Sequence, residues 1–296
     1  MSAAEINDVE VGLHRSSIWT NIRDLLRKQP LGAVGAFIVL TMIFLAVFVE
    51  IVTVYDPVDN KFDDMLLAPS AEYWLGTDQF GRDILTRIIH GSRTALFVGL
   101  VCAFIGATSG LVLGVTSAYF GGTFDLLFMR VIDVFMAFPV IIMALAIVSI
   151  FGSSLPYLIF AITLPIVPDC ARIVRSNALQ IRSIPYIDAA RALGFSHTRI
   201  ILRHMLPNVM APYLIIFTSA IGGAILLEAS LSYLGLGVQE PTPAWGLMLQ
   251  GGAEEYLESA FWMSFFPGLA IALAVFGFNM FGDAVRDVLD PRLRRR

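Results

Sequence analysis

Long stretches without a charged side chain constrain this sequence more than any other feature. A helix needs about 20 apolar residues to cross the hydrocarbon core of a bilayer. Uncharged, mainly apolar windows of that length or more lie at Gln29–Val49, Thr94–Phe124, Val134–Pro168, Met205–Leu227 and Ser259–Gly282. The third window is long enough for two crossings and carries a turn sequence, GSSLP, near its middle (152–156). The sequence therefore predicts an all-α integral membrane protein with six transmembrane helices.

Composition supports a membrane protein and offers no sign of a nucleic-acid partner. Hydrophobic residues make up 57% of the 296 residues and charged residues 15%, whereas a soluble domain carries about a quarter charged residues. The net charge of −4 gives no basic surface for nucleic acid. The two cysteines, Cys102 and Cys170, lie in or beside apolar windows, and we expect both to be small buried side chains. The first window is too long for a signal-peptide core, so we expect it to be retained as a membrane span.

The distribution of lysine and arginine predicts the orientation. Sixteen of the 20 basic residues fall in four places. Four precede the first window, one is Arg130, six lie in 169–207 and five follow the last window. The loop Val238–Glu258 has no basic residue and four glutamates. By the positive-inside rule, both termini and the 169–207 segment are cytoplasmic. We expect four regions: a cytoplasmic N-terminal segment (1–30), a first transmembrane helix with an external loop (31–93), a five-helix core (94–285) and a basic cytoplasmic tail (286–296).

A polar stretch, DAARALGFSHTRIILRHMLPN (188–208), interrupts the apolar windows. Pro185 suits a helix N-terminus, and Gly194 suits the position after a helix end, where φ is positive. Ser196 can cap a second helix that stops at Pro207 and leads into the fifth span. The sequence thus predicts a cytoplasmic helical hairpin. Such a loop could rest on anionic lipid headgroups, but small residues beside a single acid favour a low-profile knob that fits a groove in another protein.

The spacing in this hairpin resembles the EAA loop of ABC-transporter permeases, which would occupy 183–207. That loop reads Glu-Ala-Ala, three residues, Gly, nine residues, Ile-x-Leu-Pro. The positions that match are Asp188, Ala189, Ala190, Gly194, Leu206 and Pro207. Two positions depart from the pattern, because Asp188 replaces Glu and His204 stands where Ile is usual.

Three further segments are similar to the C-type permease of the dipeptide, oligopeptide and nickel branch of that family. They read LGTDQFGRDILTRIIHGSR (75–93), ILLEASLSYLGLGVQEPTPAWG (225–246) and FNMFGDAVRDVLDPR (278–292). The likeness extends from about residue 25 onward. It implies the type I importer permease architecture in a bacterial inner membrane, with the EAA loop forming a coupling helix that seats in a cleft of an ATP-hydrolysing subunit.

The same resemblance implies the partners and the cargo. The partners would be a homologous second permease, forming a heterodimer, two ATP-binding subunits and an extracytoplasmic substrate-binding protein. The cargo would be di- or oligopeptides, with nickel chelates, glutathione, opines and oligosaccharides as alternatives.

The residues themselves argue against chemistry in this chain. A P-loop needs a glycine-rich turn ending in Lys and Ser or Thr, whereas neither lysine here, Lys28 or Lys61, follows a glycine. The sequence has no H-E-x-x-H or G-x-S-x-G motif. We therefore expect a transport subunit rather than an enzyme, without a cofactor of its own, whose ATP and Mg²⁺ are bound by the partner ATPase subunits.

Charged residues near the predicted outer face are a second candidate site. Thr77 or Asp78 could cap a helix that begins near Asp83. Arg82 and Arg87 lie outside against the charge rule, so we expect them to pair with these acids in an elbow at the membrane surface. The alternative is a gate or a docking surface for the binding protein, formed by Asp78, Arg82, Asp83 and Glu228.

Three charged residues lie within or beside the predicted spans: Glu228 towards the outer edge of the membrane, and Arg130 and Asp133 near its inner edge. Glu228 lies about 17 residues into the fifth window, roughly 26 Å along a helix, which favours an interface carboxylate or helix-end anchor over a central ligand. Arg130 and Asp133 are three residues apart and are expected to pair. Glu240 belongs to the acidic external loop, which is either solvated surface or a contact for the binding protein.

A transporter or channel driven by an ion gradient is the rival from another class. Such proteins show repeats, and ionisable groups or broken helices near the midplane. The sequence has no clear internal repeat, and the charges of its windows cluster near their ends. These features favour the ABC permease.

Overall fold

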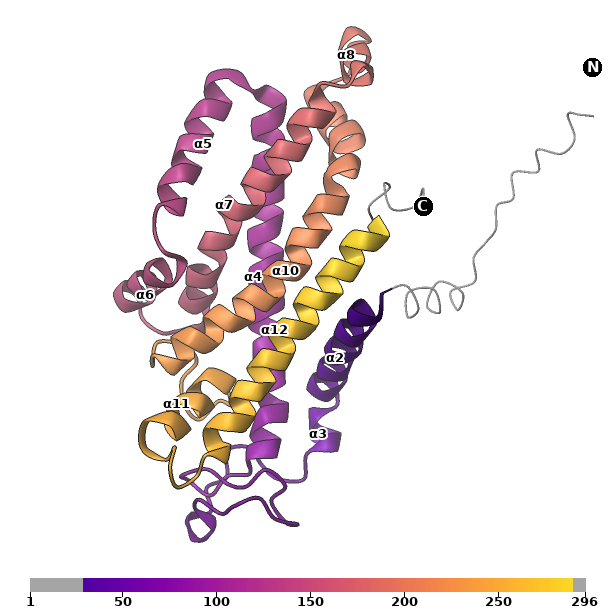
Figure 1. Cartoon of the computed structure of the whole chain (residues 1–296). Helices are drawn as coiled ribbons and strands as arrows, with labels where there is room; N and C mark the ends of the chain where they lie inside the picture. Colours follow the sequence, from indigo (N-terminus) through magenta and orange to yellow (C-terminus); the bar gives the residue numbers. More distant parts are fainter. Residues whose placement is uncertain (1–28, 290–296) are drawn as a thin grey trace, which may run out of the picture.

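The computed structural model describes residues 29–289, and its regular secondary structure within that range is helical (Figure 1). The elements are α2 (Pro30–Val47), α3 (Val49–Val52), the 3₁₀ turn η1 (Phe62–Asp64), α4 (Ile84–Phe120), α5 (Gly122–Met136), α6 (Val140–Phe151), α7 (Leu155–Arg182), α8 (Pro185–Ala192), α9 (His197–Ile200), the π-turn η2 (Ile201–Met205), α10 (Leu206–Tyr233), α11 (Trp245–Glu255) and α12 (Trp262–Leu289). Most of the predicted N-terminal segment (1–30) and of the predicted basic tail (286–296) lies outside the described residues.

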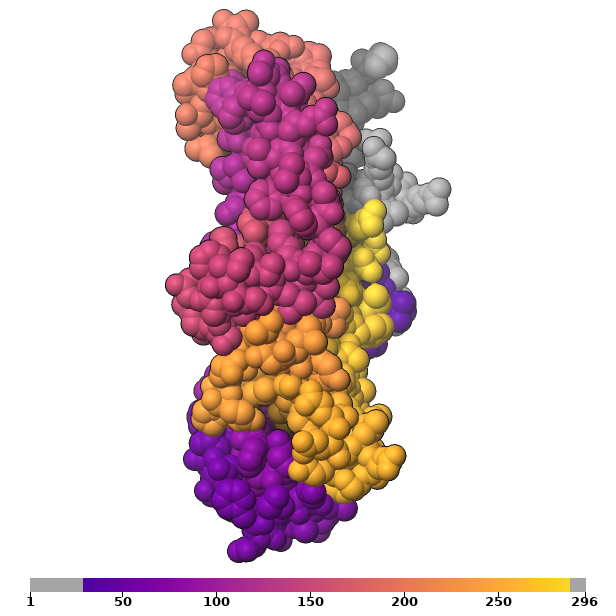
Figure 2. Space-filling model, turned by 90° about the vertical axis from the view of Figure 1, so that its left-hand side faces the viewer, coloured from indigo at the N-terminus to yellow at the C-terminus, as the bar shows by residue number. Residues whose placement is uncertain are grey.

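The long helices run between two distinct ends of the molecule. At one end α8 and α9 form the predicted hairpin, which we call the hairpin end. At the other end residues 53–83 and α11 form a cap, which we call the cap end (Figure 1). Figure 2 shows the α5–α6 side of the molecule, with the hairpin at the top and residues 53–83 at the bottom. The two candidate sites therefore lie at opposite ends of one helical bundle.

Five helices are long and apolar enough to span a membrane, which confirms the all-α membrane fold. They are Pro30–Val47, Ile84–Phe120, Leu155–Arg182, His197–Tyr233 and Trp262–Asp287. The span expected at the start of the third window, from Val134, is broken, because α5 and α6 meet there at a bend of 85°. Pro139 explains the bend, since its ring supplies no N–H and disfavours helical geometry at the preceding residue. The count of six holds when this bent pair is one span.

The ends of α4 also differ from the expected second span. This helix begins at Ile84 rather than near Thr94 and ends at Phe120, where Gly121 adopts φ +64°. Its N-cap is Asp83, whose carboxylate accepts a hydrogen bond from the Thr86 N–H at 2.8 Å. Capping by Thr77 or Asp78 was therefore the wrong expectation, because Asp83 lies directly before the first helical turn.

The glycines of α4 are the reason why it packs so closely against α7. Gly106, Gly110 and Gly114 recur every four residues and share one helix face. A Cβ atom at Gly110 would lie 2.6 Å from the Cβ of Cys170 and 2.8 Å from a backbone oxygen of α7. The Cys170 thiol donates to the Ala107 carbonyl across the same contact at 3.1 Å. Both cysteines are buried and free, as expected.

The first and last long helices of the bundle, α2 and α12, lie side by side. α10 and α12 lie beside α4, and α2 packs along α12 at the periphery (Figure 1). Gly35 of α2 allows this approach, since a Cβ there would lie 2.7 Å from the Cβ of Met280. The α5–α6 pair lies on the opposite side, next to α7.

Replacing Gly110 with Ala tests the α4–α7 contact. The added methyl group overpacks the interface against backbone atoms, which should cost about 1–3 kcal/mol of stability. The thermal unfolding midpoint of the purified protein in detergent measures this loss. Gly268→Ala is the matched control, because the nearest atom to its Cβ would be 3.7 Å away. Equal midpoints for the two variants would contradict the packing described above.

Candidate functional site

The hairpin turn is built by a helix-ending motif that only glycine fits easily. α8 begins at Pro185 and ends at Ala192. Gly194 follows with φ +75°, the positive value expected from the sequence. The Phe195 N–H donates to the Ala190 carbonyl (3.1 Å) and the Gly194 N–H donates to the Arg191 carbonyl (2.9 Å). These two bonds form a Schellman motif, which fixes the direction in which the chain leaves α8.

The second helix of the hairpin is continuous with a membrane span. Ser196 caps α9 as expected, with its Oγ accepting from the Arg199 N–H at 3.4 Å. The predicted stop at Pro207 is wrong, because the π-turn η2 carries the helix into α10. Pro207 occupies the first turn of α10, where its missing N–H is tolerated, and the wider π-turn precedes it. The hairpin is therefore joined to α10 without an intervening loop.

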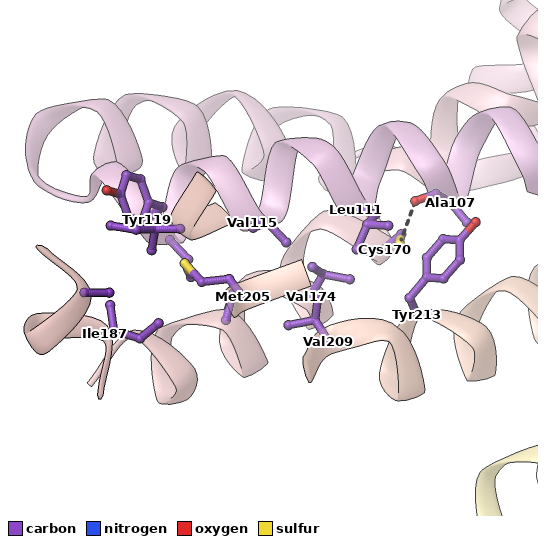
Figure 3. Packing of buried hydrophobic residues seen from close by; sticks show 14 residues of the cluster. Ala107, Leu111, Val115, Tyr119, Cys170, Val174, Ile187, Met205, Val209 and Tyr213 are labelled. Atoms are coloured by element: carbon purple, nitrogen blue, oxygen red, sulfur yellow. Dashed lines mark hydrogen bonds between the residues drawn. The ribbon is translucent and has the colours of Figure 1, made fainter. Parts of the chain in front are cut away.

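The inner face of the hairpin is anchored in a hydrophobic cluster. Ile187 and Ala190 of α8 and Met205 of η2 are buried in this cluster. Figure 3 shows Ile187 and Met205 near Tyr119 and Val115 of α4. The rest of the cluster comes from Ile200 of α9 and from α4, α7 and α10, including Leu111, Val174 and Val209. The hairpin is thus packed as part of the bundle.

The six residues that match the EAA pattern divide between two faces. Ala190 is buried and Leu206 is partly buried against the cluster. The side chain of Asp188 is 70% exposed. Ala189, Gly194 and Pro207 are also exposed. The four exposed residues can contact another protein, while Ala190 and Leu206 hold the hairpin against the cluster.

A polar contact joins the hairpin to the end of α4. The Tyr119 hydroxyl lies 2.6 Å from Nδ1 of His197, the first residue of α9. The Arg191 guanidinium lies 5.3 Å from the centre of the Tyr119 ring and 3.1 Å from the Asp188 carboxylate. The exposed acid is thereby connected to a central helix of the bundle. Sequence reasoning missed Tyr119 and His197, because they are 78 residues apart and no motif spacing relates them.

His204, which departs from the family pattern, lies within the hairpin. Its ring stacks on Phe195 with the centroids 5.9 Å apart and an interplanar angle of 18°. Its backbone carbonyl accepts hydrogen bonds from the Tyr186 hydroxyl (3.0 Å) and from Asn208 Nδ2 (2.7 Å). A histidine here therefore fills an aromatic layer between the two arms of the hairpin.

At the cap end, a buried ion-pair network joins two loops to α4. Arg82 donates to Asp78 (2.6 Å) and to Glu240 (2.9 Å). Arg87 donates to the Pro57 carbonyl at 2.8 Å and lies 3.4 Å from Glu240. The Arg87 side chain is only 1% exposed. The expected ion-paired elbow is present, and Glu240 pairs with both arginines although its side chain is 42% exposed.

The four candidates for an outer gate or docking surface are all buried in this chain. Asp78 and Arg82 belong to the network, and Asp83 caps α4. Glu228, 2% exposed, accepts a hydrogen bond from Ser232 at 2.6 Å within α10. The structure therefore does not bring Glu228 together with the other three. Glu228 lies five residues before Tyr233, the last residue of α10, and its predicted place near the membrane interface stays a prediction.

Hydrogen bonds also fix the cap around Tyr73. Its hydroxyl donates to the Asp64 carboxylate at 2.7 Å, and this hydrogen bond, together with burial, raises the pKa of Tyr73 above its usual value. The Trp262 indole N–H donates to the Thr77 carbonyl at 3.3 Å, which ties the cap to α12. These contacts make the cap a rigid extension of the bundle.

Charged pairs also hold α5 against α7. Arg130 and Asp133 lie 4.0 Å apart, as expected, but Asp133 accepts a closer hydrogen bond from Arg172 of α7 at 2.7 Å. Asp125 accepts two hydrogen bonds from Arg175 at 2.5 Å. These two arginines belong to the segment 169–207 that the sequence predicts to be cytoplasmic, and they lie in the part of α7 that follows the uncharged window.

Comparison with family models covers most of the chain. Residues 110–295 match the model described as "Binding-protein-dependent transport system inner membrane component". Residues 17–69 match the "N-terminal TM domain of oligopeptide transport permease C".

Similar curated proteins match over almost their full length. A "Dipeptide transport system permease protein DppC" from Alkalihalophilus pseudofirmus is 42% identical over 94% of this chain and 91% of its own. A "Putative peptide transport system permease protein" from Brucella suis is 40% identical over 95% and 94%. A "Glutathione transport system permease protein GsiD" from Escherichia coli is 38% identical over 93% and 91%.

A solved structure shares the fold. The chain is similar to one from the inward-facing MetNI methionine ABC transporter, with a TM-score of 0.58 and 19% identity. The match covers 70% of this chain and 98% of the other.

Proposed function

This chain belongs to the binding-protein-dependent transport system inner membrane components, the permeases of ABC importers, and we propose that it forms part of the path through which such an importer moves short peptides. The relatives reported above are named for dipeptides, peptides and glutathione, which is itself a short peptide. Their names favour short peptides over nickel chelates, opines or oligosaccharides as the cargo.

The hairpin is proposed as the contact with the ATPase subunits. The observation that carries this proposal is that an exposed face at Asp188 and Ala189 lies on a hairpin that is continuous with α10 and bonded to α4 through Tyr119. Movement of the exposed face must then displace two central helices. Gly194, Leu206 and Pro207 support this face, and Ala190 anchors it.

The proposed assembly distributes the remaining tasks among partners. A homologous second permease completes the membrane path, and two ATP-binding subunits bind ATP and Mg²⁺ and hydrolyse the nucleotide at the cytoplasmic side. The hairpin end and both termini are cytoplasmic in this proposal, in agreement with the excess of lysine and arginine there.

The cap end is proposed to face an extracytoplasmic substrate-binding protein. Burial of Asp78, Arg82, Asp83 and Glu228 supports an indirect role for these residues. They would hold the shape of the cap that the binding protein meets rather than contact it themselves.

Reconstitution into vesicles tests the proposed function. With both permeases, the ATPase subunits and the binding protein present, uptake of a labelled dipeptide should require ATP inside the vesicles. Omitting the ATPase subunits should abolish that uptake. The rival, a transporter or channel driven by an ion gradient, predicts instead that this chain alone takes up the peptide when a proton or sodium gradient is imposed. That result would overturn the proposal.

A further inference from the structure

The helical bundle contains a cavity beside α7 and α10. Its volume is about 620 Å³, and its walls come from α7, from α10 and from the ends of α5 and α6 at their bend. We propose that this cavity binds the ammonium group of the cargo through the carboxylate of Asp169. The proposal rests on the proposed function, because it specifies which group of a short peptide the permease itself recognises.

Asp169 is an exposed carboxylate on the cavity wall, with Arg172 one turn away on the same helix. It lies 14 residues after Leu155, the start of α7, which is roughly 21 Å along the helix and within the length of a membrane span. Among residues 29–289, no hydrogen bond or ion pair to its carboxylate is formed, whereas Asp125 and Asp133 are both paired with arginines. A charged group within a membrane span is costly, and it commonly marks the path of a substrate or ion.

Arg172 also lines the cavity, but its charge is already compensated. Its guanidinium lies one turn after Asp169 and donates to Asp133 of α5 at 2.7 Å. Asp133 lies 4.0 Å from a second arginine, Arg130. Because Asp133 engages the Arg172 guanidinium on the side of α5, Asp169 is the charged side chain of the cavity wall whose hydrogen-bonding capacity is left for a ligand among residues 29–289.

The other walls strengthen a preference for cations. Most of the lining is apolar, including Ile162, Ile166, Ile215 and Leu227, and low polarity increases the attraction between opposite charges. Pro165 in the α7 wall lacks the N–H that would bond the carbonyl four residues earlier, so an additional acceptor is freed nearby. Neither feature stabilises a carboxylate of the cargo.

The wall formed by α10 leaves room for the cargo. Ser219 and Gly223 lie on successive turns of this wall. A Cβ atom at Gly223 would meet no atom within 4 Å, so the space beside this glycine is open. The whole volume falls within the range of roughly 300–1,000 Å³ that small-ligand sites occupy. We therefore expect the cavity to hold a dipeptide with a free amino terminus.

A charge-sensitive thiol reaction tests the electrostatic part of the proposal. Ser219→Cys places a thiol on the cavity wall in the assembled transporter, and cationic and anionic methanethiosulfonate reagents of equal size are compared. Adding Asp169→Asn should lower the ratio of the cationic to the anionic rate by about tenfold. Asp169→Glu and the exposed control Glu50→Gln should leave the ratio unchanged. Because each ratio is measured within one preparation, differences in folded yield cancel.

Protection of the same thiol tests the occupant. Without the binding protein, alanyl-alanine should slow the modification, whereas N-acetyl-alanyl-alanine should not, and Asp169→Asn should remove the difference. Equal protection by the two peptides, or an unchanged reagent ratio in Asp169→Asn, would overturn the proposal and indicate that Asp169 faces a cationic side chain of the second permease. The readout does not use ATP. Protection without ATP-driven peptide uptake would therefore reject the proposed function and keep the cation site.

Discussion

Replacing Asp78 with Asn should lower the thermal unfolding midpoint of the protein by roughly 10 °C, because breaking a buried ion pair costs about 3–5 kcal/mol. The loss should be large because Asp78 lies next to two buried guanidinium groups, those of Arg82 and Arg87. Without its charge, only Glu240 would face both arginines. The side-chain oxygen that accepts from the Phe80 and Arg82 backbone N–H groups is retained in Asn, so the variant removes the charge and the hydrogen bond from Arg82 Nε while keeping the turn.

An exposed pair at the same end provides the matched control. Glu50 pairs with Arg93 at 3.1 Å, but both side chains are at least half exposed. Glu50→Gln removes a carboxylate from an arginine in the same way and should cost only about 0–1 kcal/mol. Scanning calorimetry of both variants in one detergent makes the comparison. Similar midpoints for Asp78→Asn and Glu50→Gln would show that the network does not hold the cap together.

Gly194→Val should uncouple transport from ATP hydrolysis while the protein still inserts into the membrane. The positive φ at this position costs an L-residue about 1–2 kcal/mol, and a β-branched side chain adds to that cost. Space is not the problem, because a Cβ atom there would meet nothing within 4 Å. Distorting the turn changes the direction of α8 relative to α10. Peptide uptake per ATP hydrolysed should therefore fall by roughly tenfold, the equivalent of 1.4 kcal/mol.

Gly235 provides an unusually close control for that experiment. It follows α10 at the cap end with φ +76°, and a Cβ atom there also meets nothing within 4 Å. The same pair of hydrogen bonds forms around it, from Leu236 to Leu231 and from Gly235 to Ser232. Gly235→Val should thus impose the same local strain without changing uptake per ATP. Gly194→Asn should retain coupling, since Asn adopts positive φ more readily. Normal coupling in Gly194→Val would contradict the role of this turn.

The features that the sequence predicts well are local ones. Uncharged windows locate the membrane helices, because burial in lipid requires about 20 consecutive apolar residues. The hairpin is predictable for the same reason: Pro185, Gly194 and Ser196 each act within their own turn of chain. Their conformations follow from backbone geometry and hydrogen bonding between near neighbours.

The features that the sequence does not predict depend on distant contacts. Pro139 marks a possible kink within an apolar window, but the size of the bend, 85°, depends on how the neighbouring helices pack. Arg82 and Glu240 are 158 residues apart, and no spacing relates them. Asp169 was placed in a cytoplasmic loop because the uncharged window ends at Pro168, yet α7 continues to Arg182. Only the packing of α7 against α10 and α5 shows that this carboxylate faces a cavity.

Cross-linking from Ala189 measures most directly whether the hairpin meets the ATPase. Ala189 is exposed beside Asp188, so Ala189→Cys introduces a thiol without removing a buried group. In the assembled transporter, a short bifunctional reagent should join this position to an ATP-binding subunit, with a yield that changes when nucleotide is added. Trp74→Cys, exposed at the cap end, should give no such product. If position 189 forms no product with the ATPase and reacts only with lipid-borne or aqueous probes, the proposed coupling through this hairpin is contradicted.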